Sequence, residues 1–219
     1  MFELYDFVMI FQNIVQNYCN QVLTEHAAVF SCVTGMSGAS LLAVGTTPAT
    51  AVLGTSIAAL YAGLYTPMKR VTPYNTHVGA IAGSLPVLMG FAAAGAPIYC
   101  PQAVMLFALQ TLWQFPHFYC LAWLHRADYS KANYKMFPLN DETGKFTADI
   151  IKPYIAALTA FPAVSCAVGA TTWMFAVDSI LANVFFAQRF IAFSKDPSPA
   201  TARSFFFASS TLKIEHLNQ

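Results

Sequence analysis

Two polar stretches of this chain carry residue types that suit the binding of a polyanion. The first, "YTPMKRVTPYN" at 65–75, holds the adjacent cations Lys69 and Arg70, and the second, at 113–146, holds Asp128. Lysine offers a point charge and arginine a planar set of donors to phosphate oxygens, while Mg²⁺ bound with phosphates takes one or two protein carboxylates. The two stretches therefore predict a diphosphate site, with the cations on the phosphates and Asp128 on the metal.

The same residues have simpler interpretations, which the sequence leaves open. Two cations at the end of an apolar run often serve only to set the topology of a membrane protein. Asp128 is equally suited to cap a helix or to pair with Arg126 or Lys131. If it binds the metal, the neighbouring acids Asp141 or Glu142 are the candidates to assist it.

His117 lies about two turns inside an apolar run, where polar side chains are costly and often functional. A structural interpretation is equally open, because Gln114 and Trp113 are placed to hydrogen-bond its ring. A neutral imidazole is also a ligand of haem iron. Asn75, near the end of another apolar run, is explained as easily by helix capping as by ligand binding.

The composition indicates a membrane protein. Of the 219 residues, 57% are hydrophobic and only 10% are charged, and the mean hydropathy is +0.52, whereas a soluble domain is about a quarter charged. The few charges are grouped, which excludes the basic face of a nucleic-acid-binding protein. The five cysteines are odd in number and form no C-x-x-C pair, so we expect free thiols rather than disulfides or metal ligands.

Six apolar runs are long enough to cross a bilayer, which takes about 20 residues. We place the spans at 27–46, 48–66, 78–96, 102–123, 151–173 and 177–194. A further run at 204–212 is too short to cross and looks like the beginning of another span. Small residues in the first and third spans predict close packing into one bundle. They are Gly35, Gly38, Ala39, Gly79, Gly83 and Gly90.

When the chain is threaded through these spans, most basic residues fall on one side of the membrane. The turns near Gly45–Pro48, Gly95–Pro101 and Phe175–Val177 carry no Lys or Arg and share the other side. This alternation agrees with the positive-inside tendency of membrane proteins. Both candidate stretches are therefore predicted to open on the same, positively charged face.

The ends of the chain differ from the rest. Residues 1–26 contain acidic residues but no Lys or Arg, so they match neither a signal peptide nor an Arg-rich transit peptide, and we expect an amphipathic helix beside the bundle. The bundle is assigned to 27–212 and a tail to 213–219.

Two longer segments carry a family resemblance. They are "YTPMKRVTPYNTHVGAIAGSLPVLMG" and "WQFPHFYCLAWLHRADYSKANYKMFPL". Their order, their separation along the chain, and an Asp-Tyr followed by Met-Phe-Pro-Leu resemble the protoheme IX farnesyltransferases, or haem O synthases, within the UbiA-type intramembrane prenyltransferases. The resemblance covers about residues 28–209.

The resemblance implies an all-α, multi-span transmembrane bundle of the UbiA type, here with about six full spans and a partial one. It implies transfer of a farnesyl group from farnesyl diphosphate to a vinyl group of haem B, giving haem O on the way to haem A. In such a reaction Mg²⁺ assists departure of the diphosphate, and the vinyl carbon attacks the allylic cation in a dry apolar chamber. Haem A synthase and oxidase assembly factors are implied partners besides the bilayer. The implied location is the mitochondrial inner membrane, with a bacterial plasma membrane as the alternative.

Carried over residue by residue, the resemblance assigns Lys69, Arg70 and Asp128 to catalysis, with Asp128 as the metal ligand. It assigns substrate contacts to five further side chains: Tyr65, Asn75, His117, Arg126 and Tyr129. Asn75 would donate to a phosphate or a haem propionate, and His117 would contact the porphyrin.

The chain departs from the family pattern at one motif. Family members carry an upstream N-x-x-x-D segment that supplies half of the metal cradle, and "FQNIVQNYCNQVLTEH" contains no such spacing. We therefore expect the chain to be a fragment, a mis-spliced product or a gene model with wrong ends, and its turnover to be low or absent. The alternative function is a non-catalytic membrane scaffold or a haem-binding fragment in oxidase assembly.

Overall fold

The computed structural model describes residues 24–217, which contain helices and no strand. Most of the predicted amphipathic segment at 1–26 lies outside the described residues. The helices, in chain order, are α2 (Thr24–Gly45), α3 (Pro48–Ala59), the π-helical η1 (Leu60–Tyr65), α4 (Thr66–Met68), α5 (Asn75–Ala93), α6 (Pro101–Leu124), α7 (Arg126–Lys131), the 3-10 helix η2 (Phe137–Asn140), α8 (Lys145–Ala167), α9 (Trp173–Lys195) and α10 (Pro199–Leu217).

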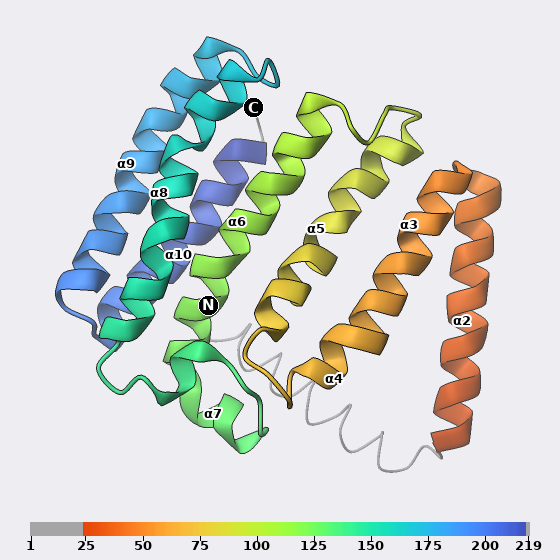
Figure 1. Cartoon of the computed structure of the whole chain (residues 1–219), viewed down its shortest axis with the longest axis horizontal. Helices are drawn as coiled ribbons and strands as arrows, with labels where there is room; N and C mark the ends of the chain where they lie inside the picture. The colour runs from red at the N-terminus through yellow and green to blue at the C-terminus, as the bar shows by residue number, and fades with distance from the viewer. Residues whose placement is uncertain (1–23, 218–219) are drawn as a thin grey trace.

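Five of these segments are long and apolar enough to cross a membrane. They are Ala28–Gly45, Pro48–Met68, Asn75–Ala93, Lys145–Ala167 and Trp173–Lys195. The remaining predicted span corresponds to α6, whose 24 residues suffice in length. Its three glutamines and His117 reduce its hydropathy, and these polar groups lie on a helix that is surrounded by other helices (Figure 1).

The structure corrects two predictions about the later spans. The turn expected at Phe175–Val177 lies at 168–172, and 175–177 belong to α9. Gly169 ends α8 in the left-handed conformation, with φ +74°, and its N–H donates to the Cys166 carbonyl at 3.0 Å. The run at 204–212 lies inside the 19-residue α10, so the boundary predicted at 212 falls within a helix, and α10 is not among the described segments that are apolar enough to cross.

The helices form two arrangements that share α6 (Figure 1). On one side α2, α3, α5 and α6 stand in a row, each packed on the next. On the other side α6, α8, α9 and α10 close into a ring, since α6 contacts α8 and α10, and α9 contacts both of these as well. The connections after α4, α6 and α9 lie at one end of the molecule, which is the end that carries both polar stretches.

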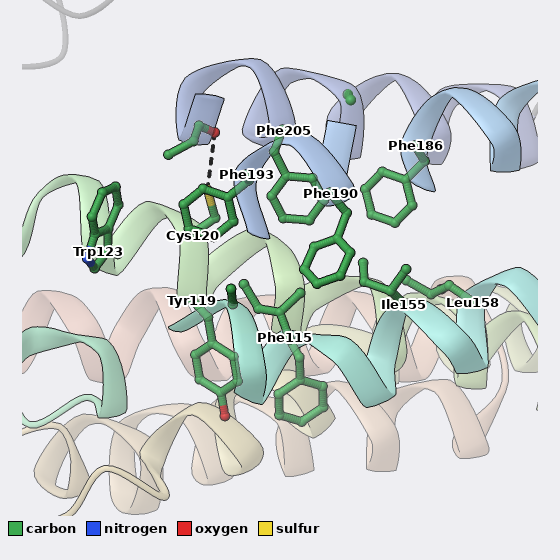
Figure 2. Close-up of a cluster of buried hydrophobic side chains, with 14 of the residues drawn as sticks. Phe115, Tyr119, Cys120, Trp123, Ile155, Leu158, Phe186, Phe190, Phe193 and Phe205 are labelled. Carbon is green, nitrogen blue, oxygen red and sulfur yellow. Dashed lines mark hydrogen bonds between the residues drawn. The ribbon is translucent and has the colours of Figure 1, made fainter. Parts of the chain in front are cut away.

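A cluster of phenylalanines fills the ring of four helices (Figure 2). Phe186 and Phe193 of α9 stack on Phe205 of α10, with ring centroids 5.2 and 6.1 Å apart. The thiol of Cys120 on α6 donates to the Ala202 carbonyl at 3.2 Å (Figure 2). In lipid, helices associate through close packing and hydrogen bonds, so the stacked rings hold α9 against α10 and the Cys120 bond joins α6 to α10.

A polar contact joins α5 to α6. The amide of Gln114 donates to the Ala80 carbonyl at 3.0 Å and lies 2.9 Å from the Ser84 hydroxyl. Gln114 is therefore committed to α5 rather than to His117. A Cβ on Gly83 would lie 2.6 Å from the Gln114 side-chain oxygen, so the predicted close packing holds at this glycine.

The other small residues divide into two groups. Gly79 packs against the ring of Tyr65, where an added Cβ would lie 2.7 Å from the nearest ring carbon. Gly35, Gly38 and Gly90 have nothing within 4 Å of an added Cβ. The packing role predicted for these last three is not observed in the part of the chain that is described.

Candidate functional site

The two polar stretches meet at one end of the molecule, and backbone contacts hold them together. The Lys135 N–H donates to the Lys69 carbonyl at 2.7 Å. The side-chain amide of Asn75, 3% exposed, donates to the Thr72 carbonyl at 2.6 Å and to the Lys135 carbonyl at 2.5 Å. Both amide hydrogens of Asn75 are thus used inside the protein. These bonds give Asn75 a positioning role, and its donation to a phosphate or propionate stays a prediction.

Lys69 lies among three tyrosine rings, which we call the tyrosine cage. Its Nζ is 4.4 Å from the ring centroid of Tyr65, 5.5 Å from that of Tyr61 and 5.8 Å from that of Tyr134. Cations are attracted to the faces of aromatic rings at these distances. Burial lowers the pKa of the Lys69 ammonium. Arg70, next to it, is exposed.

Local structure brings the cage together. Tyr61 and Tyr65 both belong to η1, a π-helical widening of the helix that begins as α3, and their centroids are 5.0 Å apart. Tyr134 comes from the loop that Asn75 and Lys69 hold in place. The cage is therefore built from both stretches.

α7 presents Asp128 and Tyr129 differently. Asp128 is exposed and lies 3.4 Å from Lys131 Nζ, with 63% of its own side chain accessible. Tyr129 turns toward the cage, with its centroid 6.0 Å from that of Tyr134. Burial, and secondarily Tyr134, raises the pKa of the Tyr129 phenol. The structure thus shows the simpler of the two interpretations of Asp128, an ion pair with Lys131.

Arg126 and Asp141 belong to a separate structural cluster. Arg126 donates to the Trp123 carbonyl at 3.2 Å, and its guanidinium lies 5.3 Å from the Trp123 ring. Both carboxylate oxygens of Asp141 accept hydrogen bonds from the segment that starts α8, including bonds of 2.7 Å from the N–H and hydroxyl of Thr147 and of 2.8 Å from the Gly144 N–H.

These bonds decide the ionisation and the role of Asp141. Burial alone would raise the pKa of its carboxyl, but the hydrogen bonds from Thr147, Gly144 and Thr143 outweigh it and lower the pKa. Asp141 is thus an ionised cap of α8. The suggestion that it assists a metal is not supported, since its oxygens are already engaged.

His117 lies apart from the cage, on the face of α6 toward α10. Its ring stacks between Trp113 and Phe206, with centroids at 4.6 and 4.4 Å, and its Nδ1 lies 2.9 Å from the Ser209 hydroxyl. These contacts fit a structural role for His117, but with Ser209 as hydrogen-bond partner instead of the predicted Gln114, and with Trp113 as a stacking partner. Its predicted contact with a porphyrin stays a prediction.

Aromatic side chains on α5, α6, η2 and α8 lie next to the cage end; we call them the aromatic lining. Each ring of the set contacts at least two others, with centroid distances of 4.3–6.4 Å. Followed from neighbour to neighbour, the set is Tyr74, His77, Phe115, Tyr154, Tyr119, Phe137 and back to Tyr74. In Figure 2, Phe115 and Tyr119 point away from the phenylalanine cluster. The buried core therefore continues around α6, with the phenylalanines on one face of this helix and the aromatic lining on another.

Sequence reasoning missed several of these residues. Tyr61 was visible as the residue one turn before Tyr65. His77 carried a weaker signal, as a polar side chain directly before the span predicted at 78–96. Its Nδ1 and the Thr76 hydroxyl are buried without a partner among the described residues. Tyr134 gave no signal, because only the loop contacts bring it to Lys69.

The described residues do not form a resident metal centre. Among residues 24–217, no three His, Cys, Asp or Glu side chains are grouped so that they could hold a metal ion. Asp128 is paired with Lys131, and Asp141 caps α8. A magnesium ion at this end would need most of its oxygen ligands from a bound diphosphate and water.

Comparison with known proteins gives a consistent result. A model of the UbiA prenyltransferase family matches residues 20–211. Proteins named protoheme IX farnesyltransferase are similar: a mitochondrial one from Arabidopsis thaliana is 35% identical over 189 residues, a mitochondrial one from Pyricularia oryzae is 36% identical over 207 residues, and one from Solibacter usitatus is 33% identical over 189 residues.

The chain spans only part of the length of these relatives. The matches include 86–87% of this chain but only 44%, 37% and 64% of the three relatives. No solved structure matches. With the family model covering most of its length and its described residues folded as a multi-span helical bundle, the chain belongs to the UbiA prenyltransferase family.

Proposed function

We propose that this chain carries a site for transfer of a farnesyl group from farnesyl diphosphate to a vinyl group of haem B, which yields haem O. The names of its relatives suggest the reaction. The observation that carries the proposal is the tyrosine cage, because it holds a partly desolvated cation where two pinned loops meet beside an aromatic lining.

The two parts of farnesyl diphosphate would bind in different places, the diphosphate at the loops and the farnesyl chain at the aromatic lining. Lys69 and the exposed Arg70 would take the diphosphate, since both offer charge-assisted hydrogen bonds to phosphate oxygens. The farnesyl chain would lie along the aromatic lining, away from water. Magnesium would enter as the counter-ion of the diphosphate, with Asp128 as its candidate protein ligand, and it would neutralise charge on the leaving group.

The reaction then breaks the bond between farnesyl C1 and its oxygen, and the electron pair leaves with the diphosphate. A ring of the aromatic lining that met the resulting allylic cation with its π face would stabilise the positive charge. The π electrons of the vinyl group form the new carbon–carbon bond to C1. Water supplies a hydroxyl to the cation left on the haem side chain and releases a proton.

The direct test uses the whole purified chain in lipid nanodiscs with tritiated farnesyl diphosphate and haem B. We expect both substrates to bind and label to reach the porphyrin slowly, because few protein ligands are available to a metal. Lys69→Ala should weaken binding of the diphosphate substrate about tenfold or more and leave haem B binding unchanged, whereas Lys195→Ala on α9 should change neither. Failure to bind either substrate would refute the proposal.

A second candidate is a haem-binding scaffold without catalysis, which the ion pair of Asp128 with Lys131 favours. It predicts a Soret shift on addition of haem B but no binding of farnesyl diphosphate. For location we propose the mitochondrial inner membrane, supported by the mitochondrial relatives, with haem A synthase or oxidase assembly factors as candidate partners.

A further inference from the structure

Four phenol groups gather near Lys69, and their hydroxyls are open to a ligand. The phenol of Tyr65 is close enough to three others to interact with them electrostatically, and these are Tyr61, Tyr129 and Tyr134. Within the described part of the chain, none of the four hydroxyls makes a hydrogen bond and none is sealed from solvent. A neutral phenol donates one hydrogen bond, so the cluster combines four unused donors with the ammonium group of Lys69.

The backbone fixes Tyr134 within this cluster. The turn after α7 contains Asn133, whose φ of +56° lies in the left-handed region that asparagine tolerates better than most residues. Across this turn the Tyr134 N–H donates to the Tyr129 carbonyl at 3.1 Å. On the other side, the Lys135 N–H donates to the Lys69 carbonyl at 2.7 Å. Because both neighbours of Tyr134 are held, little freedom is lost when its hydroxyl binds a ligand.

The cluster is suited to an anion with many oxygens. The Lys69 ammonium carries a full charge, and Arg70 lies exposed beside it. The acid that precedes Tyr129, Asp128, is 3.4 Å from Lys131 Nζ and is thus engaged by another cation. A diphosphate has several charged oxygens, which accept hydrogen bonds from hydroxyls and from an ammonium group at the same time. It therefore matches the cluster better than a carboxylate, which has only two oxygens.

We propose that Tyr134 is a substrate-binding residue, whose hydroxyl donates to a phosphate oxygen of farnesyl diphosphate while its ring stays beside the Lys69 ammonium. The first polar stretch then supplies the cation and the second a neutral donor. The identity of the substrate rests on the proposed function, whereas the anion site rests on the cluster alone.

The test measures binding of inorganic pyrophosphate to the whole purified chain in phosphatidylcholine nanodiscs, by calorimetry without added magnesium. Tyr134→Phe keeps the ring and removes only the hydroxyl, so the affinity should fall about 10- to 150-fold. Tyr99→Phe is the matched control and should bind as the wild type does, since Tyr99 is 82% exposed in the α5–α6 connection at the opposite end. Unchanged affinity in Tyr134→Phe would overturn the proposal.

Thermal unfolding separates this role from a structural one. The hydroxyl of Tyr134 has no partner within the described residues, so Tyr134→Phe should unfold at the same temperature as the wild type. A variant that loses affinity and also unfolds several degrees earlier would assign the loss to the loop and contradict the proposal.

A lipid phosphate is the competing source of the same chemistry. In nanodiscs with phosphatidylglycerol, we expect the wild type and Tyr134→Phe to lose pyrophosphate affinity by the same factor, through the surface charge of the membrane. A larger loss in the wild type would show a headgroup on the Tyr134 hydroxyl and overturn the proposal. If pyrophosphate binding needs this hydroxyl but no farnesyl reaches haem B, the reaction is refuted and the anion site stands. Farnesyl transfer with pyrophosphate binding that ignores Tyr134→Phe would refute only the role of Tyr134.

Discussion

Lys69 combines a full charge with aromatic neighbours, and the two act on it in different ways. The faces of Tyr61, Tyr65 and Tyr134 attract the ammonium group, while loss of water disfavours it and lowers its pKa. Whether Lys69 binds an anion therefore depends on pH. Nearby Tyr129 has its pKa raised by burial, so its phenol stays neutral further into the alkaline range.

This arrangement predicts how binding of inorganic pyrophosphate changes with pH. Binding needs the ammonium form, so affinity should fall as pH rises through the Lys69 pKa, which lies below the ordinary lysine value of 10.5. Lys69→Arg should keep its affinity over the same range, because a guanidinium stays charged. Isothermal titration calorimetry from neutral to alkaline pH compares the two proteins. Parallel profiles would show that Lys69 does not control the binding.

Replacing Asn75 should lower the stability of the fold. Asn75→Ala removes the two hydrogen bonds from its buried amide and leaves the Thr72 and Lys135 carbonyls without that donor. The expected loss is about 1–3 kcal/mol in the free energy of unfolding, measured by chemical denaturation in detergent. Asn140→Ala changes an exposed asparagine at the same end of the molecule and should stay within about 0.5 kcal/mol. Equal effects would remove the positioning role of Asn75.

Between helices, glycine spacing determines how closely α5 approaches its neighbours. Gly83 and Gly90 both lie in α5, but only at Gly83 would a Cβ meet a side chain, the Gln114 oxygen at 2.6 Å. Gly83→Ala should therefore destabilise the protein by about 1–3 kcal/mol through overpacking. Gly90→Ala should be neutral or stabilise the helix by up to about 1 kcal/mol. Thermal unfolding in detergent ranks the two variants, and the opposite ranking would contradict the α5–α6 contact.

The elements also show which features the sequence could predict. The positions of most spans and the shared end of the polar stretches follow from hydropathy and charge, since both depend only on composition along the chain. The α8–α9 turn was missed because the apolar run continues through Trp173, whereas the helix actually ends by a left-handed Gly169. α10 was underestimated because Ser209 and Ser210 lower its hydropathy, although their hydroxyls donate to the Phe206 carbonyl within the helix.

The candidate site was predictable only in part for a related reason. Lys69, Tyr65 and Tyr129 could be chosen from local residue types, and the structure brings them to one end. The contribution of Tyr134 and the commitment of Asn75 depend on contacts between residues 60 positions apart. Such contacts follow from how α5 and the loop after α7 pack, which no local pattern encodes.

At the scale of the whole molecule, α6 divides a closed ring from an open row (Figure 1). The ring of α6, α8, α9 and α10 contains the phenylalanine cluster, while the row of α5, α3 and α2 leaves many apolar side chains exposed. The tyrosine cage lies at the end of the row, where α4 meets the loop after α7. This geometry requires both polar stretches to face the same compartment.

That requirement can be tested with the native Cys100, which lies in the α5–α6 connection at the opposite end. In a background that lacks the other cysteines, Arg70→Cys and Lys131→Cys would each be compared with Cys100 in sealed, uniformly oriented vesicles. A membrane-impermeant maleimide should label both introduced thiols from one side and Cys100 only from the other. Leu41→Cys, whose site is 74% exposed within α2, should stay unlabelled from either side, because it faces lipid. Labelling at positions 70 and 131 from opposite sides would separate Lys69 from Tyr134 by a membrane and contradict the cage, because the contact between these residues cannot form across a bilayer.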